Sequence, residues 1–214
     1  MVVAIDGPAG SGKGTIAKLV AERLKLVYID SGATYRCVAL ACLRNNIKLE
    51  EKDKIIALTK TLNIEFDEHQ KTYLNKEDVS SLIRSKEVTS ICSQISSIVE
   101  VREILVDLQR KMANSKNVIM EGRDITTVVF PNADFKFYLD ASVEERAKRR
   151  FKQNKELGIN TSMEEIIESI KFRDYNDMHK PVGSLMRTPE QIYVDSTNMT
   201  IPEVVETIIE YVNK

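Results

Sequence analysis

The sequence predicts an α/β fold of three layers, with helices on both faces of a parallel five-stranded sheet. Short apolar runs alternate along the chain with stretches of helical periodicity, which is typical of parallel strands joined by crossover helices. The first run, Val2–Ile5, leads through a glycine-rich turn into apolar residues at helical spacing, namely Ile16, Leu19, Val20 and Leu24. The runs that we expect to form the five strands are 2–5, 27–30, 118–121, 135–140 and 192–195.

Acidic residues end four of these runs: Asp30, Glu121, Asp140 and Asp195. Right-handed crossovers place the carboxyl ends of all parallel strands on one edge of the sheet, and ligands bind along that edge. We therefore expect these acids to mark the functional edge.

Composition limits the possible function classes. With 214 residues, of which 43% are hydrophobic, the chain is long enough for one sizeable domain with small insertions. The net charge of −1 gives no overall basic field, so we expect no binding to nucleic acids or acidic membranes. No run approaches the roughly 18 apolar residues of a membrane span, and no charged leader precedes an apolar region. We therefore expect a cytoplasmic protein.

Cysteine and histidine give no sign of metal or nucleophilic chemistry. Cys37, Cys42 and Cys92 form no CxxC pair, and we expect small core residues in a reducing compartment. His69 and His179 have no Cys or His partner at ligand spacing, so a zinc site and a Ser-His-Asp nucleophile lack support.

Two insertions interrupt the alternation of strands and helices. The stretch 31–114 is too long for one crossover, and the alternating residues 62–66 and 71–74 predict a small β insertion at about 62–84. A second insertion, at 146–180, is highly charged and almost wholly helical apart from 158–161. Both insertions follow the expected functional edge, which favours parts that close over a ligand.

The glycine-rich turn after the first strand matches a phosphate-binding loop, or P-loop. Its backbone N–H groups and the start of the following helix suit a nucleotide triphosphate, and Lys13 adds a charge for the outer phosphates. The hydroxyl that usually binds Mg²⁺ is replaced by Gly14, so we expect ATP phosphates and water, and no confident protein ligand, to hold Mg²⁺. The ATP-binding residues predicted are Gly7, Pro8, Ala9, Gly10, Ser11, Gly12, Lys13, Gly14 and Thr15.

A second motif points elsewhere but has little weight. Residues 75–78 read Asn-Lys-Glu-Asp, which matches the NKxD motif that reads guanine in GTPases. The chain has no DxxG segment, and the tetrapeptide lies within the predicted β insertion. A GTPase switch is therefore disfavoured.

Arginines and lysines are needed wherever two polyanions approach each other for phosphoryl transfer. Arg146, Arg149 and Arg150 stand at i, i+3 and i+4, so one helical face would carry three guanidiniums. Alone, this spacing favours a solvated surface; beside a P-loop it favours a helical lid that neutralises the transferring group. A further set, Arg173, Asp177 and Lys180, fits one helix at i, i+4 and i+7, as would an ordinary surface ion pair.

The order of many short motifs resembles the bacterial cytidylate kinases along nearly the whole chain. The loop Gly-Lys-Gly-Thr is customary in nucleoside monophosphate kinases. The matching segments are 30–36, 74–80, 93–94, 101–102, 122–124, 127–131, 139–142, 145–147, 173–174 with Asp177, and 195–197.

The resemblance implies an ATP-dependent kinase of CMP and dCMP, monomeric, with Mg²⁺ as cofactor. It implies a P-loop core at 1–30, 115–145 and 181–214, a monophosphate-binding region at 31–114, and a lid with an acceptor-contacting helix at 146–180. The implied catalytic residues are Lys13, Arg146, Arg150 and Arg173. The implied CMP-binding residues are Ser31, Tyr35, Arg36, Ser93, Arg102, Arg123, Asp124, Arg173, Asp177 and Lys180.

Cytosine chemistry agrees with these implied residues. Cytosine presents an amino donor beside ring acceptors, so Asp124 and Ser93 can accept from the amino group while Arg102 donates to the ring. Uracil would set its O4 against Asp124, at a cost of a few kcal/mol. Asp177 can accept from the ribose 3′-hydroxyl that CMP and dCMP share.

Three positions depart from the family pattern. Lys180 stands where an arginine that helps to hold cytosine is common, which keeps the charge and loses the planar fork. Glu121 replaces a frequent aspartate and Lys76 a turn glycine, without loss of a needed charge.

Two other functions stay open on the sequence alone. One is a P-loop kinase of another small acceptor, such as a different nucleoside monophosphate or shikimate. The other is a non-catalytic nucleotide-binding switch.

Overall fold

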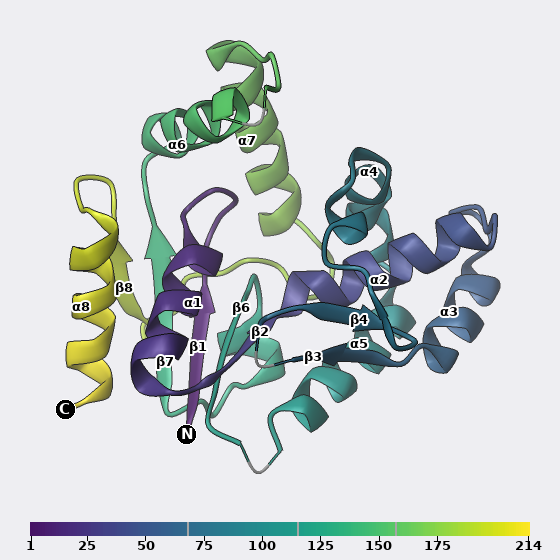
Figure 1. Cartoon of the computed structure of the whole chain (residues 1–214), viewed down its shortest axis with the longest axis horizontal. Helices are drawn as coiled ribbons and strands as arrows, with labels where there is room; N and C mark the ends of the chain where they lie inside the picture. Colours follow the sequence, from purple (N-terminus) through teal and green to yellow (C-terminus); the bar gives the residue numbers. More distant parts are fainter. Residues whose placement is uncertain (68, 115, 157) are drawn as a thin grey trace. The chain divides into compact units, whose positions relative to one another are not determined.

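The structure is a computed structural model of the chain, and it describes residues 1–67, 69–114, 116–156 and 158–214 (Figure 1). Five strands form one sheet in the order β2-β6-β1-β7-β8. Their bounds are Val2–Asp6 for β1, Val27–Asp30 for β2, Val118–Gly122 for β6, Phe135–Asp140 for β7 and Ile192–Asp195 for β8. Strand β1 pairs in parallel with β6 and β7, and β7 pairs in parallel with β8. The predicted α/β fold with a five-stranded sheet is confirmed.

The chain divides into two compact units, one made of Met1–Leu26 with Asn117–Lys214 and the other of Val27–Lys116. The finer division into a core at 1–30, 115–145 and 181–214, a monophosphate-binding region at 31–114 and a lid at 146–180 stays a prediction.

In the first unit, helices α1 (Lys13–Leu24) and α8 (Ile201–Val212) pack against each other, and α1 also packs against β1 and β6. Helix α1 buries Ile16, Ala17, Val20 and Ala21, whereas Leu19 is exposed. Helix α8 begins with a capping box between Thr200 and Glu203.

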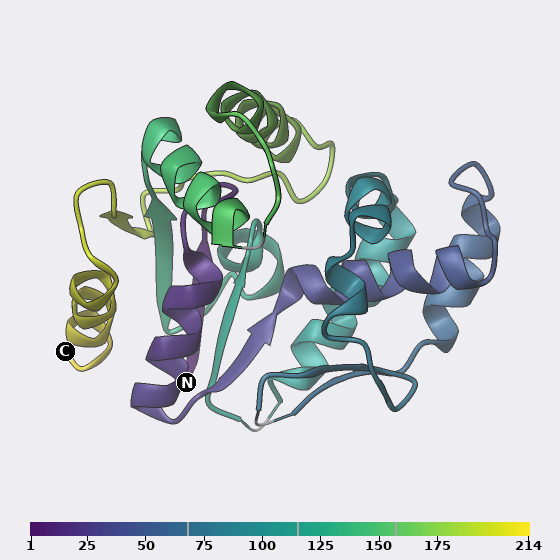
Figure 2. The same cartoon turned by 45° about the horizontal axis from the view of Figure 1, so that its top comes forward.

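Helices α6 (Val143–Glu156) and α7 (Met163–Met178) pack together through Ala147, Ile166 and Ile170. Figures 1 and 2 show α6 starting just beyond the carboxyl end of β7. Most of the charged segment 146–180 is helical, as predicted. The expectation that Arg173, Asp177 and Lys180 share one helix is wrong for Lys180, because α7 ends at Met178. Lys180 precedes a proline, which disfavours helical backbone at that position.

In the second unit, α2 (Ser31–Arg44) forms the middle of a hydrophobic core. Around it lie α3 (Lys52–Thr61), the short 3₁₀ turn η1 (Leu82–Arg84), α4 (Lys86–Ile95) and α5 (Val99–Met112). Cys37 and Cys42 are buried in this core with free thiols, and Cys92 is half-buried. Burial raises the pKa of Cys37 to about 12 and that of Cys42 to about 11, so both thiols stay protonated.

The predicted β insertion is confirmed as an antiparallel sheet of β3 (Ile64–Phe66), β4 (Thr72–Leu74) and β5 (Glu77–Asp78). Asn75 and Lys76 form the turn between β4 and β5, with positive φ angles of 50° and 72°. Glu77 forms an ion pair with Arg44 at 2.7 Å. The tetrapeptide at 75–78 is therefore a hairpin turn followed by strand β5, which accounts for its residues without guanine binding.

Candidate active site

The phosphate-binding loop joins β1 to α1 in the first unit. Gly7 has a φ of 155°, and a Cβ atom there would lie 2.0 Å from the carbonyl oxygen of Leu139. Gly12, which precedes α1, has a left-handed φ of 92°. Both positions require glycine. Because α1 begins directly after Gly12, the loop leads to the first N–H groups of that helix. Such N–H groups bind anions in many proteins.

Lys13 is folded onto this loop. Its ammonium group donates to the carbonyl of Pro8 at 2.8 Å and to the hydroxyl of Ser11 at 3.3 Å, and only 4% of the residue is exposed. Burial, and secondly the charge of Arg123, lower the pKa of Lys13 to about 7. A phosphate would stabilise the charged form of Lys13.

Ala9, in the middle of the loop, is held by α6 and α7. The carboxylate of Asp174 accepts from the Ala9 N–H at 3.2 Å, and Nη1 of Arg146 donates to the Ala9 carbonyl at 2.9 Å. Arg146 and Asp174 also bond each other at 2.6 Å, and Nε of Arg146 donates to the Ala141 carbonyl at 2.9 Å. These contacts fix the loop backbone from both of its sides.

Asp174 was not among the sequence-predicted site residues. Its sequence signal is its position four residues after Ile170, on the face of α7 that also buries Ile166. An acidic residue on the apolar face of a helix indicates a buried partner. Here that partner is Arg146.

The other predicted basic residues of α6 and α7 differ in their surroundings. Arg149 donates from Nη1 to the Ser11 carbonyl at 3.4 Å and from Nη2 to the Ser196 carbonyl at 2.6 Å. Arg150 and Arg173 are exposed. Arg146 and Arg149 therefore reach the loop backbone.

Three predicted acceptor residues meet in the first unit. Nε of Arg123 donates to the carboxylate of Asp177 at 2.7 Å, and Lys180 pairs with the other oxygen of Asp177 at 3.1 Å. Burial alone would raise the pKa of Asp177, but Arg123 and Lys180 lower it below its ordinary value. Asp124 is buried at the start of the π-helical turn η2 (Ile125–Val129). In the first unit, the carboxylate of Asp177 therefore lies between the positive side chains of Arg123 and Lys180. Asp124, the residue after Arg123, is a second buried carboxylate.

The second unit holds the remaining predicted acceptor residues. Arg36 donates to the Asp30 carboxylate at 2.6 Å, and Arg84 reaches the same oxygen at 3.2 Å. Burial would raise the pKa of Asp30, but these two arginines lower it. The guanidinium of Arg102 lies over the ring of Tyr35, 5.4 Å from its centre.

The carbonyls of Ser31 and Ser93 accept hydrogen bonds within the second unit. Ser31 is buried, and its carbonyl accepts from Thr34 at 2.7 Å. Ser93 is exposed on α4, and its carbonyl accepts from the hydroxyls of Ser96 and Ser97.

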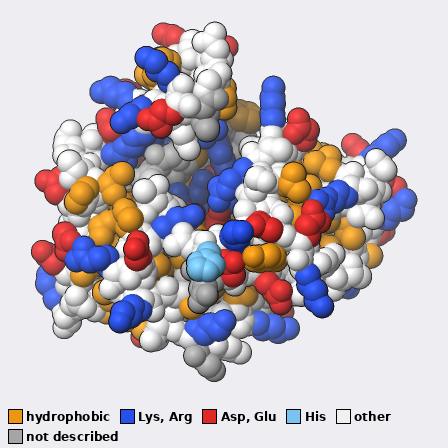
Figure 3. All heavy atoms as spheres, viewed as in Figure 1, with side chains coloured by type: hydrophobic (Ala, Val, Ile, Leu, Met, Phe, Trp, Pro, Cys, Tyr) orange, Lys and Arg blue, Asp and Glu red, His pale blue; other side chains and the backbone are white. Residues whose placement is uncertain are grey.

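Charges of both signs are mixed on one face of the molecule. On the face seen in Figure 3, basic and acidic side chains lie beside one another, including those of α6 at the top of the view. No described helix is long and apolar enough to cross a membrane. Within the described ranges, no group of three or more His, Cys, Asp or Glu side chains is placed to hold a metal ion.

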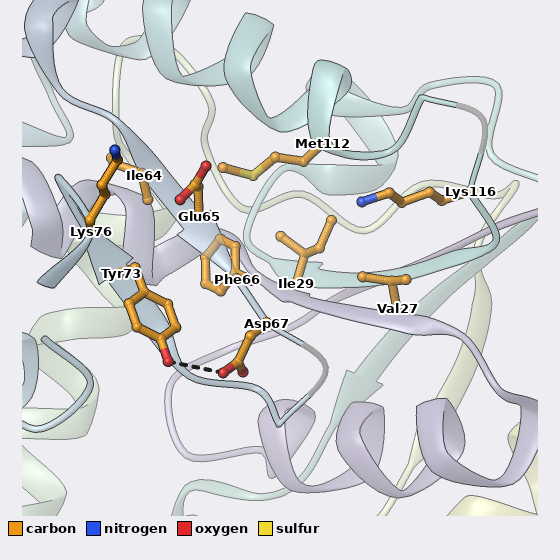
Figure 4. A pocket seen from close by; sticks show the side chains of 10 residues that line it. All are labelled: Val27, Ile29, Ile64, Glu65, Phe66, Asp67, Tyr73, Lys76, Met112 and Lys116. Atoms are coloured by element: carbon orange, nitrogen blue, oxygen red, sulfur yellow. Dashed lines mark hydrogen bonds between the residues drawn. The ribbon is translucent and has the colours of Figure 1, made fainter. Parts of the chain in front are cut away.

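A cavity of about 460 Å³ opens in the second unit (Figure 4). Its apolar lining is Val27, Ile29, Ile64, Phe66 and Met112, and its polar lining is Glu65, Asp67, Tyr73, Lys76 and Lys116. The hydroxyl of Tyr73 donates to Asp67 at 3.1 Å. None of these ten described lining residues is predicted to bind ATP or CMP.

Comparison with known proteins identifies a family. A family model described as cytidylate kinase matches residues 3–214. A cytidylate kinase of Fusobacterium nucleatum is 45% identical over 214 residues, which are 100% of this chain and 98% of that protein. Another, of Caldanaerobacter subterraneus, is 46% identical over 212 residues, with 99% and 94% of the two chains covered.

Solved structures agree on the fold. A shikimate kinase of Bacteroides thetaiotaomicron aligns with a TM-score of 0.50 at 13% identity, over 100% of this chain and 99% of the other. An uncharacterized protein of Eubacterium ventriosum aligns with a TM-score of 0.58 at 11% identity, again over 100% and 99%. At such identities the likeness concerns the fold alone. The full-length sequence matches, together with the phosphate-binding loop, show that the chain belongs to the cytidylate kinase family of P-loop kinases.

Proposed function

We propose that this protein transfers the γ-phosphoryl group of MgATP to CMP or dCMP, giving CDP or dCDP and ADP. The observation that carries the proposal is the single unit in which a buried P-loop lysine and the Arg123–Asp177–Lys180 cluster occur together. Family membership over the full length supports the same activity. The reaction belongs to pyrimidine nucleotide metabolism, and we propose a monomeric enzyme of the cytoplasm.

The donor site is the loop from Gly7 to Thr15. Its N–H groups would hold the phosphates of ATP, while Lys13 leaves its contacts with Pro8 and Ser11 for the outer phosphates. Position 14 carries no side-chain oxygen, so Mg²⁺ would arrive with ATP and keep phosphate and water ligands.

The acceptor would be bound by the residues that the sequence predicts for it. Asp124 and Ser93 would accept from the cytosine amino group, and Arg102 would donate to the ring. Asp177 would accept from the ribose 3′-hydroxyl, beside Arg173 and Lys180. Ser31, Tyr35, Arg36 and Arg123 would line the base and phosphate of the acceptor.

Phosphoryl transfer requires positioning and charge neutralisation more than a protein nucleophile, because an oxygen of the acceptor phosphate attacks directly. Lys13, Arg146, Arg150 and Arg173 would supply the positive charge. Arg146 would act through its hydrogen bond to the Ala9 carbonyl, whereas Arg150 and Arg173 are exposed residues of the proposed 146–180 lid. Closing of this lid would exclude the water that otherwise hydrolyses ATP.

The test is a coupled assay of ADP release with CMP, dCMP, UMP, AMP and shikimate as acceptors. We expect the highest kcat/KM for CMP and dCMP. A higher value for AMP or shikimate would make the chain a kinase of another acceptor. Tight ATP binding without turnover on any acceptor would indicate a nucleotide-binding switch.

A further inference from the structure

Asp6 is the last residue of β1, directly before the first glycine of the phosphate-binding loop, and its exposed fraction is 0%. Its carboxylate accepts three hydrogen bonds. Oδ1 accepts from the N–H of Ile125 at 2.8 Å, and Oδ2 accepts from the N–H of Thr126 at 2.8 Å and from its hydroxyl at 2.6 Å. All three donors therefore belong to the turn that begins immediately after Asp124.

That turn is an unusual piece of backbone. Residues 125–129 form a single π-helical turn, and the carbonyl of Asp124 accepts from the N–H groups of Val128 at 2.8 Å and Val129 at 3.1 Å. Single π turns of this kind occur frequently at functional sites. The side chain of Gln191 donates to the Thr126 hydroxyl at 2.5 Å. Thr126 therefore connects Asp6 with the residue directly before β8. The position of Asp124 thus depends on a turn that Asp6 holds at its first two N–H groups.

The sheet brings the same residues together. In the parallel ladder between β1 and β6, Asp6 stands opposite Gly122, two residues before Asp124. Asp6 therefore connects the phosphate-binding loop to the segment that carries Asp124 in two ways. It pairs with Gly122 in the sheet, and its carboxylate bonds the turn after Asp124.

Charge also connects Asp6 with both sites. Burial raises the pKa of Asp6 to about 6, although the bonds from Thr126 and Ile125 lower it, and the charge of Asp124 adds to the rise. The negative charge of Asp6 in turn raises the pKa values of Lys13 and Arg123. Burying the charge of Asp6 costs free energy, and its carboxylate makes three hydrogen bonds to one turn. Such a fully bonded buried group fixes the geometry of the residues that it contacts.

We infer that Asp6 is a positioning residue that sets base selectivity, by holding the turn that carries Asp124 in register with the phosphate-binding loop. This inference rests on the proposed function. An asparagine has one oxygen and one amide group, and the amide would face a donor of residue 125 or 126. The turn would then shift, and Asp124 with it.

The experiment compares kcat/KM for CMP and for UMP in the wild type and in Asp6→Asn. We expect the CMP to UMP ratio to fall about tenfold, mostly through a higher KM for CMP, because a displaced carboxylate loses its discrimination. Thr126→Val removes the bonds of the hydroxyl to Asp6 and Gln191 but keeps both N–H bonds to Asp6, so it should lower the ratio in the same direction by less. This second variant also decides the matter if Asp6→Asn does not fold.

The matched control is Asp134→Asn. The Asp134 carboxylate accepts from the N–H of Val2 at 2.6 Å, at the opposite end of β1. Its replacement by asparagine should leave the CMP to UMP ratio unchanged. If the CMP to UMP ratio of kcat/KM values stays at its wild-type value in the folded Asp6 and Thr126 variants, Asp6 does not set base selectivity and the inference is wrong. A wild type that does not favour CMP over UMP would instead contradict the proposed function, independently of both variants.

Discussion

Arg146 and Asp174, on helices α6 and α7, form a buried ion pair with an Nη1–Oδ2 distance of 2.6 Å. Their side chains are 5% and 12% exposed, and both also bond the backbone of Ala9. The pair therefore joins the two helices of the charged segment to the phosphate-binding loop. An arginine that the sequence assigned to the transferring phosphoryl group therefore also supports the loop.

The first prediction concerns this pair. Asp174→Asn leaves the Arg146 charge buried with a neutral partner, and breaking a buried pair on one side costs about 3 to 5 kcal/mol. We expect the free energy of unfolding in urea to fall by an amount of that order. The control is Glu145→Gln, which breaks the half-exposed pair with Arg149 at 3.1 Å and should cost less than about 1 kcal/mol. Equal losses in the two variants would contradict the supporting role of Asp174.

The second prediction concerns Lys13 and pH. Its pKa is lowered to about 7 in the folded protein, so between pH 7 and pH 10 the unfolded chain binds more protons at this residue. The contribution of Lys13 to stability is therefore complete above its unfolded pKa and is lost as the pH falls through about 7. Relative to Lys13→Met, the wild type should gain about 2 kcal/mol between pH 7 and pH 9.

Urea unfolding of both proteins across this pH range measures the effect. Lys13→Met should also lose most turnover on CMP, because no lysine ammonium group then neutralises the outer phosphates of ATP. A Lys18→Met variant, also on α1, is the matched control for removal of a lysine. A wild-type and Lys13→Met difference that does not change with pH would contradict the buried state of Lys13.

The third prediction concerns Asp124, which is buried at the start of η2. Asp124→Asn replaces an acceptor by a group that can donate to O4 of uracil, so the preference for CMP over UMP should fall by about tenfold or more. Steady-state kinetics with both acceptors measures the ratio of the kcat/KM values. Asp107→Asn, at an exposed aspartate of α5, serves as control. An unchanged ratio would remove Asp124 from the cytosine site.

The fourth prediction concerns Lys180, which pairs with Asp177 at 3.1 Å. Lys180→Arg restores the planar fork common in the family, so we expect the KM for CMP to fall a few-fold while the KM for ATP stays constant. Lys180→Met removes the charge and should raise the KM for CMP. If the arginine and methionine variants change this KM in the same direction, the charge at position 180 has no part in acceptor binding.

Much of the fold follows from local patterns. The apolar runs and their acidic ends gave the strands, and alternation around polar turn residues gave the small antiparallel sheet at 64–78. These signals are readable because they depend on neighbours in the chain. Lys180 shows the limit, since its spacing from Arg173 fitted a helix that ends at Met178.

The sequence by itself determined the phosphate-binding loop, because glycine spacing and Lys13 are local requirements of anion binding by backbone N–H groups. It also determined the family, through many motifs in one order. Only the tertiary structure decided what Asp6 and Asp174 do. Each is a buried carboxylate that bonds a backbone N–H more than a hundred residues away, Ile125 for Asp6 and Ala9 for Asp174. No spacing rule connects such residues, since it is the sheet and the packing of α6 on α7 that bring them together.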